Sequence, residues 1–502
     1  MSIRRYPVFE EIAGQVSSLD VFDLIKDRPY SFFLDSGMDP ERLGRYSFIG
    51  SSPFLVMKSH GRKITLAYQN QPEETIHGNP FDTLAELLEK YRLDRCSAPV
   101  PFLGGAVGYL SYDLCHFIER LPSTAIDDLN IPEVYFAFYD AVLAFDHLEG
   151  RAYIIATGFP ELEEGKRLRQ ARLRLKEIKN WLYFSRSVSE TELHISPCCY
   201  QLNGEERLRS NFSPEEYIEA VGKVREYIAA GDVYQVNLSQ RFEADLAIPS
   251  YKLYRRLRQI NPAPFASYLN FDEVNIVSAS PERFLKLRGD LVETRPIKGT
   301  RPRGKNPAED ELLATELLCS IKDRAENVMI VDLERNDLGR VCRYGSIKVT
   351  ELATLETFPT VFHLTSTIVG RLSQGKNGID LLKACFPGGS ITGAPKVRAM
   401  EIIDELEPTR RNVYTGSIGY LCFNGDLDLN IAIRTFLIKE SEAYFQVGGG
   451  VVWDSNPQAE YTETLDKAKA LIQALGRALE PTYPIGKPKT VISKPSTLGF
   501  PI

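Results

Sequence analysis

The sequence lacks the features that mark membrane proteins and nucleic-acid-binding proteins. Of its 502 residues, 43% are hydrophobic, yet there is no run of about 18 apolar residues, so no membrane-spanning helix is predicted. The net charge is -7 and the isoelectric point is about 5.7, which argues against the basic surface that nucleic acid requires. The amino-terminal stretch leads into Glu10 and Glu11 instead of an apolar signal core. We therefore predict a cytoplasmic protein with no membrane or nucleic-acid partner.

Metal-binding patterns of histidine and cysteine are also missing. The eight cysteines form no Cys-x-x-Cys spacing, and the adjacent Cys198 and Cys199 suit neither an ordinary disulfide nor a zinc site. The six histidines contain no His-x-x-x-His pattern. We predict reduced cysteines, most of them in the core, and no transition-metal site.

The pattern that is present favours an α+β fold with antiparallel sheets, because runs of strands alternate with single helices and no regular βαβ order appears. Ser213, Pro214 and Glu216 predict a capped helix start. Helices are predicted at 81–91, 161–182, 213–230, 309–334, 377–385, 396–406 and 457–479. Strands are predicted at 31–34, 45–50, 54–58, 63–68, 104–110, 134–145, 152–156, 233–245, 265–287, 345–352, 361–368, 414–422, 427–438 and 443–448.

The chain is long enough for two domains. Residues 183–211 are polar and irregular, which predicts a linker. We therefore divide the chain into an amino-terminal part, 1–205, a second part, 206–480, and a loose tail rich in proline and lysine, 481–502.

The segment 294–304 contains two prolines and two glycines, so it is predicted to be a shaped loop or a bulged strand. Lys298 lies in it among arginines. Burial and neighbouring cations would both oppose charging of this lysine, and a neutral lysine is a nucleophile or a base. The alternative is a surface loop with solvated cations.

Two predicted helices carry carboxylates at helical spacing. Glu460, Glu463 and Lys467 share one face of the last helix, and Asp323 and Glu326 share one face of an earlier helix. Together these oxygen ligands suit a hard cation such as Mg²⁺ better than zinc. Two solvated acidic faces are the alternative.

Glycine-rich segments mark two further candidate sites. The loop 386–396 fails the Walker pattern, because Ala394 follows Gly393, but it leads into a helix start where Ser390 and Thr392 could help bind an anion. A purely structural turn is the alternative. Three consecutive glycines, Gly448, Gly449 and Gly450, predict a close approach of another group.

Arg434 lies in a predicted apolar strand. It either faces a carboxylate from the interior or lies on the polar face of the strand, and we favour the first.

Four motifs resemble those of the chorismate-utilising enzymes, which include anthranilate, aminodeoxychorismate, isochorismate and salicylate synthases. The resemblance is strong over 210–478, and residues 1–205 are similar to the amino-terminal part of anthranilate and aminodeoxychorismate synthases. It implies large antiparallel sheets packed together, helices outside and an active site between the sheets. The motifs are Pro296-Ile297-Lys298-Gly299-Thr300-Arg301-Pro302, Asp332-Leu333-Glu334-Arg335-Asn336-Asp337, Gly389-Ser390-Ile391-Thr392-Gly393-Ala394-Pro395-Lys396 and Glu460-Tyr461-Thr462-Glu463-Thr464.

The resemblance also implies roles for these residues. Mg²⁺ would be held by Glu326 and Glu463, supported by Asp323 and Glu460. The carboxylates of chorismate would be bound by Tyr414, Arg434 and Lys467, with backbone N–H groups near Gly449. Glu282 would be the general acid, with a raised pKa. Lys298 would attack C2 as the C4 hydroxyl leaves, ammonia would then replace the lysine from C4, and His363 would have a positioning role.

Two positions suggest a branch within the family. In the isochorismate and salicylate synthases that this sequence resembles, the position that matches Gln235 holds a lysine base. An amide cannot act as that base. Lys298 lies where anthranilate synthases typically have alanine, so the resemblance favours the aminodeoxychorismate synthases. An anthranilate synthase, a bifunctional enzyme of both pathways and a non-catalytic sensor of chorismate or tryptophan are the alternatives.

The resemblance further implies a partner and a second ligand. The chain has no Gly-x-Cys-x-Gly elbow, so ammonia is expected from a separate glutaminase subunit. A tryptophan pocket is implied, where Phe265-Ala266 replaces the usual tyrosine and methionine. Regulation by tryptophan, a structural tryptophan and an empty packed pocket all stay open. The implied pocket residues are Ser36, Arg45, Tyr46, Ser47, Pro264 and Phe265.

Overall fold

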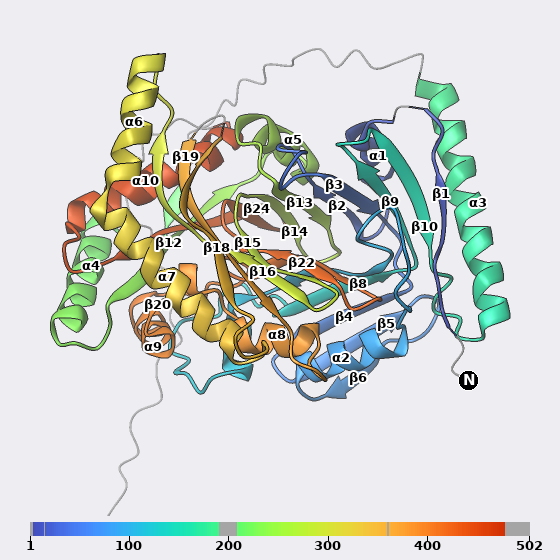
Figure 1. Cartoon of the computed structure of the whole chain (residues 1–502), viewed down its shortest axis with the longest axis horizontal. Coiled ribbons are helices and arrows are strands. Elements are labelled where there is room, and N and C mark those ends of the chain that lie inside the picture. The colour runs from blue at the N-terminus through green and yellow to red at the C-terminus, as the bar shows by residue number, and fades with distance from the viewer. Residues whose placement is uncertain (1–3, 15, 190–207, 359–360, 477–502) are drawn as a thin grey trace, which may run out of the picture.

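The computed structural model describes residues 4–14, 16–189, 208–358 and 361–476. Within them, the chain forms two large sheets in which every paired strand is antiparallel, with helices around them. Figure 1 shows the strands crossing the middle of the molecule, with α3 along one side and α4, α6 and α10 at the other. The predicted α+β class and the antiparallel sheets are confirmed.

The first sheet combines strands from both ends of the chain in the order β1-β10-β9-β3-β2-β13-β14-β23-β24-β12-β11, with β20 beside β12. Its strands are β1 (Val8–Glu11), β2 (Ser31–Asp35), β3 (Tyr46–Gly50), β9 (Ala141–Asp146), β10 (Arg151–Ala156), β11 (Arg209–Ser210), β12 (Gln235–Asp245), β13 (Phe265–Asn270), β14 (Asn275–Ser280), β20 (Gly393–Ala394), β23 (Thr435–Lys439) and β24 (Glu442–Val451).

The second sheet also combines strands from both ends of the chain, in the order β17-β19-β16-β15-β22-β21-β7-β8-β4-β5-β6, with β18 beside β19. Its strands are β4 (Leu55–His60), β5 (Lys63–Tyr68), β6 (Glu74–His77), β7 (Gly105–Leu110), β8 (Val134–Tyr139), β15 (Arg283–Arg288), β16 (Leu291–Arg295), β17 (Ile297–Pro302), β18 (Lys348–Thr357), β19 (Val361–Arg371), β21 (Ser417–Cys422) and β22 (Leu427–Asn430).

The helices lie around these sheets, and no helix in the described part of the chain is both long and apolar enough to cross a bilayer. They are α1 (Ser18–Ile25), α2 (Pro80–Lys90), α3 (Glu164–Ser189), α4 (Pro214–Ala229), α5 (Ser250–Ile260), α6 (Pro307–Cys319), α7 (Ile321–Gly339), α8 (Gly378–Cys385), α9 (Lys396–Leu406) and α10 (Pro457–Ala474), with 3-10 turns η1 (Tyr112–Phe117) and η2 (Gly389–Ile391).

Both sheets join the two predicted parts of the chain. In the first sheet β2 pairs with β13, and in the second β7 pairs with β21. The predicted boundary near residue 205 lies among residues 190–207, outside the described residues, as does the tail from 481. The two halves therefore share their sheets, and their status as domains stays a prediction.

Several predicted elements are divided or shortened. The helix at 309–334 is two helices, because Ser320 ends α6 and its side chain accepts a hydrogen bond from the Asp323 backbone N–H at the start of α7. The strands at 134–145 and 427–438 are each two strands that lie in different sheets. The last helix ends at Ala474, where Gly476 has a φ of +78°. Helix α5 is not among the predicted helices.

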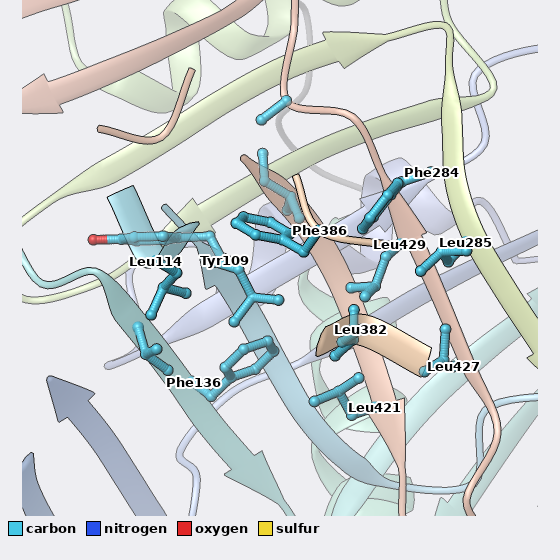
Figure 2. Packing of buried hydrophobic residues seen from close by; sticks show 14 of the residues in the cluster. Tyr109, Leu114, Phe136, Phe284, Leu285, Leu382, Phe386, Leu421, Leu427 and Leu429 are labelled. Carbon is cyan, nitrogen blue, oxygen red and sulfur yellow. The ribbon is translucent and has the colours of Figure 1, made fainter. Parts of the chain in front are cut away.

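A continuous apolar cluster fixes the turn that follows α8. Figure 2 shows Leu382 of α8 beside Leu421 and Leu427 of the second sheet, with Phe386 nearby. All four side chains are buried. Because Phe386 is anchored in this cluster, the position of the turn η2, which begins three residues later, is fixed relative to the second sheet.

Candidate active site

Glu282 lies in the connection between β14 and β15, and its side chain is buried. Its Oε1 accepts hydrogen bonds from the Ser390 hydroxyl at 2.6 Å and from the backbone N–H of Ile297 at 3.3 Å. Burial raises the pKa of Glu282 to about 7, although both hydrogen bonds and the charge of Lys298 favour the ionised form. A carboxyl group with this pKa can act as a general acid near neutral pH.

Lys298 lies on β17 at a β-bulge. The pairing of β17 with β19 shifts between Ile297 and Thr300, so the sequence prediction of a bulged strand is confirmed. Gly299 has a φ of +84° and lies close to Asp323 and Leu317, a conformation that favours glycine. Lys298 lies close enough to Glu326, Glu282 and Glu463 for their charges to affect its pKa.

Burial lowers the pKa of Lys298, and Glu326 and Glu282 oppose this effect. Among the described residues its amine has no hydrogen-bond or ion-pair partner. The cation that contributes to the lowering is Lys467 rather than a neighbouring arginine. The arginines that flank Lys298 are each paired with carboxylates, Arg295 with Glu356, Arg301 with Glu316 and Asp323, and Arg303 with Asp310.

The predicted carboxylates of α7 and α10 do approach one another. Burial raises the pKa of Glu326 and of Glu460, and the charge of Glu460 adds to the effect on Glu326. Lys467 lowers the pKa of Glu463, whose Oε1 lies 2.8 Å from the lysine Nζ. Crowded carboxylates of this kind are relieved by a cation.

The donor set fits Mg²⁺ in chemistry, because it consists of carboxylate oxygens alone. Among the described residues, no three acidic, histidine or cysteine side chains converge as a complete ligand set. Mg²⁺ needs no such set, since one or two carboxylates with substrate and water often hold it. Asp323 is less suited than predicted, because its Oδ2 pairs with Arg301 at 3.1 Å.

The three predicted glycines lie on β24 opposite β12. A methyl group at Gly449 would lie 3.1 Å from Oε2 of Glu460, so glycine here leaves room for the carboxylate. Lys467 donates a 2.8 Å hydrogen bond to the carbonyl of Gly448. Gly450 lies against the buried amide of Gln235, which has no hydrogen-bond partner among the described residues.

Arg434 is not in a strand, contrary to the prediction. It precedes β23 with a φ of +53°, at the place where the chain passes from the second sheet to the first. The expected protein carboxylate is missing too, since no acidic side chain of the described residues pairs with it. Burial lowers its pKa, and Tyr414 opposes this. The guanidinium is therefore available for an anionic ligand.

His363 and Tyr414 accompany Arg434. Nδ1 of His363 lies 2.8 Å from the Thr300 hydroxyl, and burial together with Arg434 lowers the pKa of His363 to about 3, so the imidazole is neutral. Burial raises the pKa of Tyr414 to about 12. A neutral histidine fixed by Thr300 agrees with the positioning role implied by the resemblance.

The two hydroxyls of the glycine-rich loop differ in use. Ser390 binds Glu282, whereas the hydroxyl of Thr392 donates to the carbonyls of Gly388 and Gly389 within the turn. The Thr392 hydroxyl therefore stabilises the loop, and its role in binding a ligand stays a prediction.

Sequence reasoning missed two buried polar residues at the site. Asn237 hydrogen-bonds to the Tyr414 side chain and to the carbonyl of Ile391. It shares a strand face with Gln235, which is the signal that could have identified it. Glu334 on α7 is buried beside η2 and accepts a 2.9 Å hydrogen bond from the Thr294 hydroxyl.

A separate cavity of about 320 Å³ lies between the two sheets, and five of the six predicted tryptophan-pocket residues line it. Ser47 does not line it, because its hydroxyl contacts His147 and accepts from the Ser36 N–H. Arg283 stacks on the Phe265 ring at 4.7 Å. The lining residues among the six are Ser36, Arg45, Tyr46, Pro264 and Phe265.

Comparison with known proteins decides the family. A family model described as chorismate binding enzyme matches residues 60–473. The chain belongs to the chorismate-binding enzymes. Aminodeoxychorismate synthase component 1 of Bacillus subtilis is 39% identical over 482 residues, covering 95% of this chain and 99% of the relative. Anthranilate synthase component 1 of Synechocystis sp. is 42% identical over 493 residues, covering 94% and 96%.

The fold comparison agrees. The crystal structure of anthranilate synthase component I from Streptococcus pneumoniae has a TM-score of 0.73 and 34% identity, and the match covers 85% of this chain and 91% of that one. The chorismate-binding enzyme fold implied by the motifs is thereby confirmed. Because relatives of both names match at similar identity, sequence identity does not decide which product this enzyme forms. The residues at the site have to decide it.

Proposed function

We propose that this chorismate-binding enzyme is the synthase component of an aminodeoxychorismate synthase, which converts chorismate and ammonia to 4-amino-4-deoxychorismate for p-aminobenzoate and folate synthesis. The observation that carries the proposal is the position of Lys298, an amine without a protein partner among the described residues, near enough to Glu282, Glu326 and Glu463 for their charges to affect its pKa. A lysine whose pKa is lowered by burial loses its proton more readily and can then act as a nucleophile. A non-catalytic sensor would need neither this lysine nor a buried acid.

In the proposed reaction, the C2–N bond to Lys298 forms as the C4–O bond breaks. Glu282 gives its proton to the departing oxygen, which leaves as water. Ammonia then attacks C4, and the C2–N bond breaks to release the lysine as a neutral amine. The new C4 ammonium returns its extra proton to Glu282. Chorismate and ammonia thus give the amine and water, and both residues regain their starting state.

Two groups of residues would hold the substrate. Arg434 and Tyr414 provide a guanidinium and a hydroxyl for one carboxylate. We also propose that Glu326 and Glu463, with Glu460 behind them, hold Mg²⁺. When bound, the ion supplies positive charge for the ring carboxylate of chorismate.

We propose a separate glutaminase subunit as the ammonia source, in line with the component 1 names of the relatives. Free ammonia should replace it at alkaline pH. Location in the cytoplasm stays a prediction. The second candidate is an anthranilate synthase or a bifunctional enzyme, which the 42% identity to a relative of that name favours. In that case Lys298 would be a bystander for the anthranilate product.

Product analysis separates the two candidates. The purified chain would be incubated with chorismate, Mg²⁺ and ammonium at alkaline pH, and the products resolved by chromatography. The proposal expects a 4-amino product that an added lyase converts to p-aminobenzoate. A fluorescent 2-amino product alone would overturn it and assign the chain to the anthranilate synthases. Both products together would indicate the bifunctional enzyme.

A further inference from the structure

A second buried carboxyl group lies behind the acid Glu282. The buried positions of α7 follow helical spacing and include Asn327, Ile330, Val331, Glu334 and Asp337. Glu334 is therefore in a stripe that faces the protein interior, where an ionised carboxylate is costly. Neither the substrate subsites nor the reaction described above uses it.

The same short segments bind both glutamates. Thr294 donates to Oε2 of Glu334 at 2.9 Å, and three residues further on the backbone N–H of Ile297 donates to Glu282. In η2, Ser390 donates to Glu282, and a methyl group at Gly389 would lie 3.6 Å from Cγ of Glu334. Glu282 and Glu334 thus both contact the same turn, the first at Ser390 and the second at Gly389.

Other charged or titratable groups face Glu334 from the elements around it. Asp337, one turn later on α7, pairs with Lys396 of α9 at 2.5 Å, so these two charges largely offset one another. Cys385 of α8 is a thiol whose pKa is raised by burial. On the side of Glu282 lies Lys298. Burial first, and then the charge of Glu282, raise the pKa of Glu334 to about 8.

We propose that Glu334 is a positioning residue for the acid, forming with Glu282 a buried carboxyl pair that retains one proton at the site. This inference rests on the proposed use of Glu282 as the acid for amination of chorismate. Two carboxylates in one apolar region resist double ionisation, so the pair titrates as a unit and keeps its last proton to higher pH than Glu282 alone would.

The pH profile of Glu334→Gln tests this. Chorismate consumption in the presence of ammonium would be followed, so that formation of either amination product is counted. The rate at each pH would be normalised to the concentration of free ammonia. We expect the alkaline limb of kcat/KM to move down by about one pH unit, because Glu282 then loses its proton alone. Glu334→Asp should restore most of the wild-type limb. Asp332→Asn is the matched control, since Asp332 is an exposed acid of the same helix.

An unmoved alkaline limb in Glu334→Gln, with kcat reduced or not, would overturn the proposal and leave Glu334 a structural residue. Infrared titration of the carboxyl C=O stretch gives a test that needs no turnover. The wild-type chain should retain a protonated carboxyl band at pH 7.5 that Glu334→Gln diminishes, and an unchanged band would contradict the pair. If the wild-type chain consumes no chorismate, the proposed function fails, while the infrared result still decides whether the pair exists.

Discussion

The Ser390 hydroxyl donates a 2.6 Å hydrogen bond to Oε1 of Glu282 in the buried part of the site. This bond favours the carboxylate, whereas burial favours the carboxylic acid, and burial prevails because the pKa of Glu282 is about 7. The turn that carries Ser390 therefore positions the acid and limits how far its pKa rises.

Removing this hydroxyl should shift the pH profile upward. In Ser390→Ala the carboxylate loses a donor, so the pKa of Glu282 rises, and the alkaline limb of kcat/KM should move up by about 0.5–1 pH unit. The maximal rate should fall because the acid is less well positioned. This direction is opposite to that expected for Glu334→Gln. A downward movement in Ser390→Ala would contradict the assigned role of the bond.

Glu282 should also make stability depend on pH. Its pKa rises from 4.5 to about 7 on folding, so the folded state binds the proton more tightly. The free energy of unfolding should therefore fall as pH rises from about 4.5 to about 7, and this contribution should be constant above that. The Glu282→Gln variant lacks this contribution. Relative to the wild type, its free energy of unfolding should therefore rise by about 3 kcal/mol between pH 4.5 and pH 8. Urea unfolding at several pH values measures this, and parallel curves would refute it.

Lys298→Ala should keep the fold and abolish the covalent intermediate. The wild-type chain trapped during turnover should gain the mass of chorismate less water, and the variant should not. The product of the variant should shift toward anthranilate if ammonia attacks C2 directly. Lys305→Ala is the control, because Lys305 is an exposed lysine directly after the segment that contains Lys298. An adduct that persists in Lys298→Ala, detected by mass spectrometry, would exclude this lysine as the nucleophile.

Glu463→Gln should weaken Mg²⁺-dependent turnover by about 10²-fold or more, since a metal ligand is lost. Asp466→Asn on the same helix is the matched control, because Asp466 is exposed and pairs with Lys469. Titration of activity with Mg²⁺ provides the measurement. An unchanged Mg²⁺ requirement in Glu463→Gln would remove it from the ligand set.

The cavity between the sheets should bind L-tryptophan. At about 320 Å³ it is large enough for an amino acid, and an empty packed pocket is the alternative. L-tryptophan should raise the melting temperature in a concentration-dependent way, and more than L-alanine does. No shift at millimolar tryptophan would contradict this, and the effect on turnover in the same samples separates regulation from a structural role.

Local signals predicted most of the helices, though not α1 or α5, and they predicted the segment around Lys298. Ser213 and Glu216 form the predicted capping box, and the prolines and glycines around Lys298 mark the observed bulge. Such features depend on backbone geometry within a few residues. Glu460 lies close enough to Glu326 for its charge to raise the pKa of Glu326. Helical spacing suggested that the two carboxylates could share a cation, but spacing does not determine how two helices distant in the sequence are placed, and the family motifs supported that placement.

Arg434 and Glu334 show why other features of the site could not be predicted from the sequence. Arg434 lies in an apolar run that reads as one strand, but the chain changes sheets there, and sequence periodicity contains no information about which sheet a strand joins. Glu334 lies on the buried stripe of α7 at the expected spacing, yet its charge makes it look exposed. Burial of a glutamate depends on Thr294, which is 40 residues away.

The pairing of β7 with β21 has a consequence for synthesis of the chain on the ribosome. Leu110 pairs with Ser417, so the edge of β7 that faces β21 has no partner until about 300 further residues have been made. At usual elongation rates this takes about 15–60 s. During that time an apolar strand edge is open to other nascent chains. A premature stop before residue 417 should therefore yield an aggregating fragment, and chaperone supply should influence how much enzyme a cell obtains.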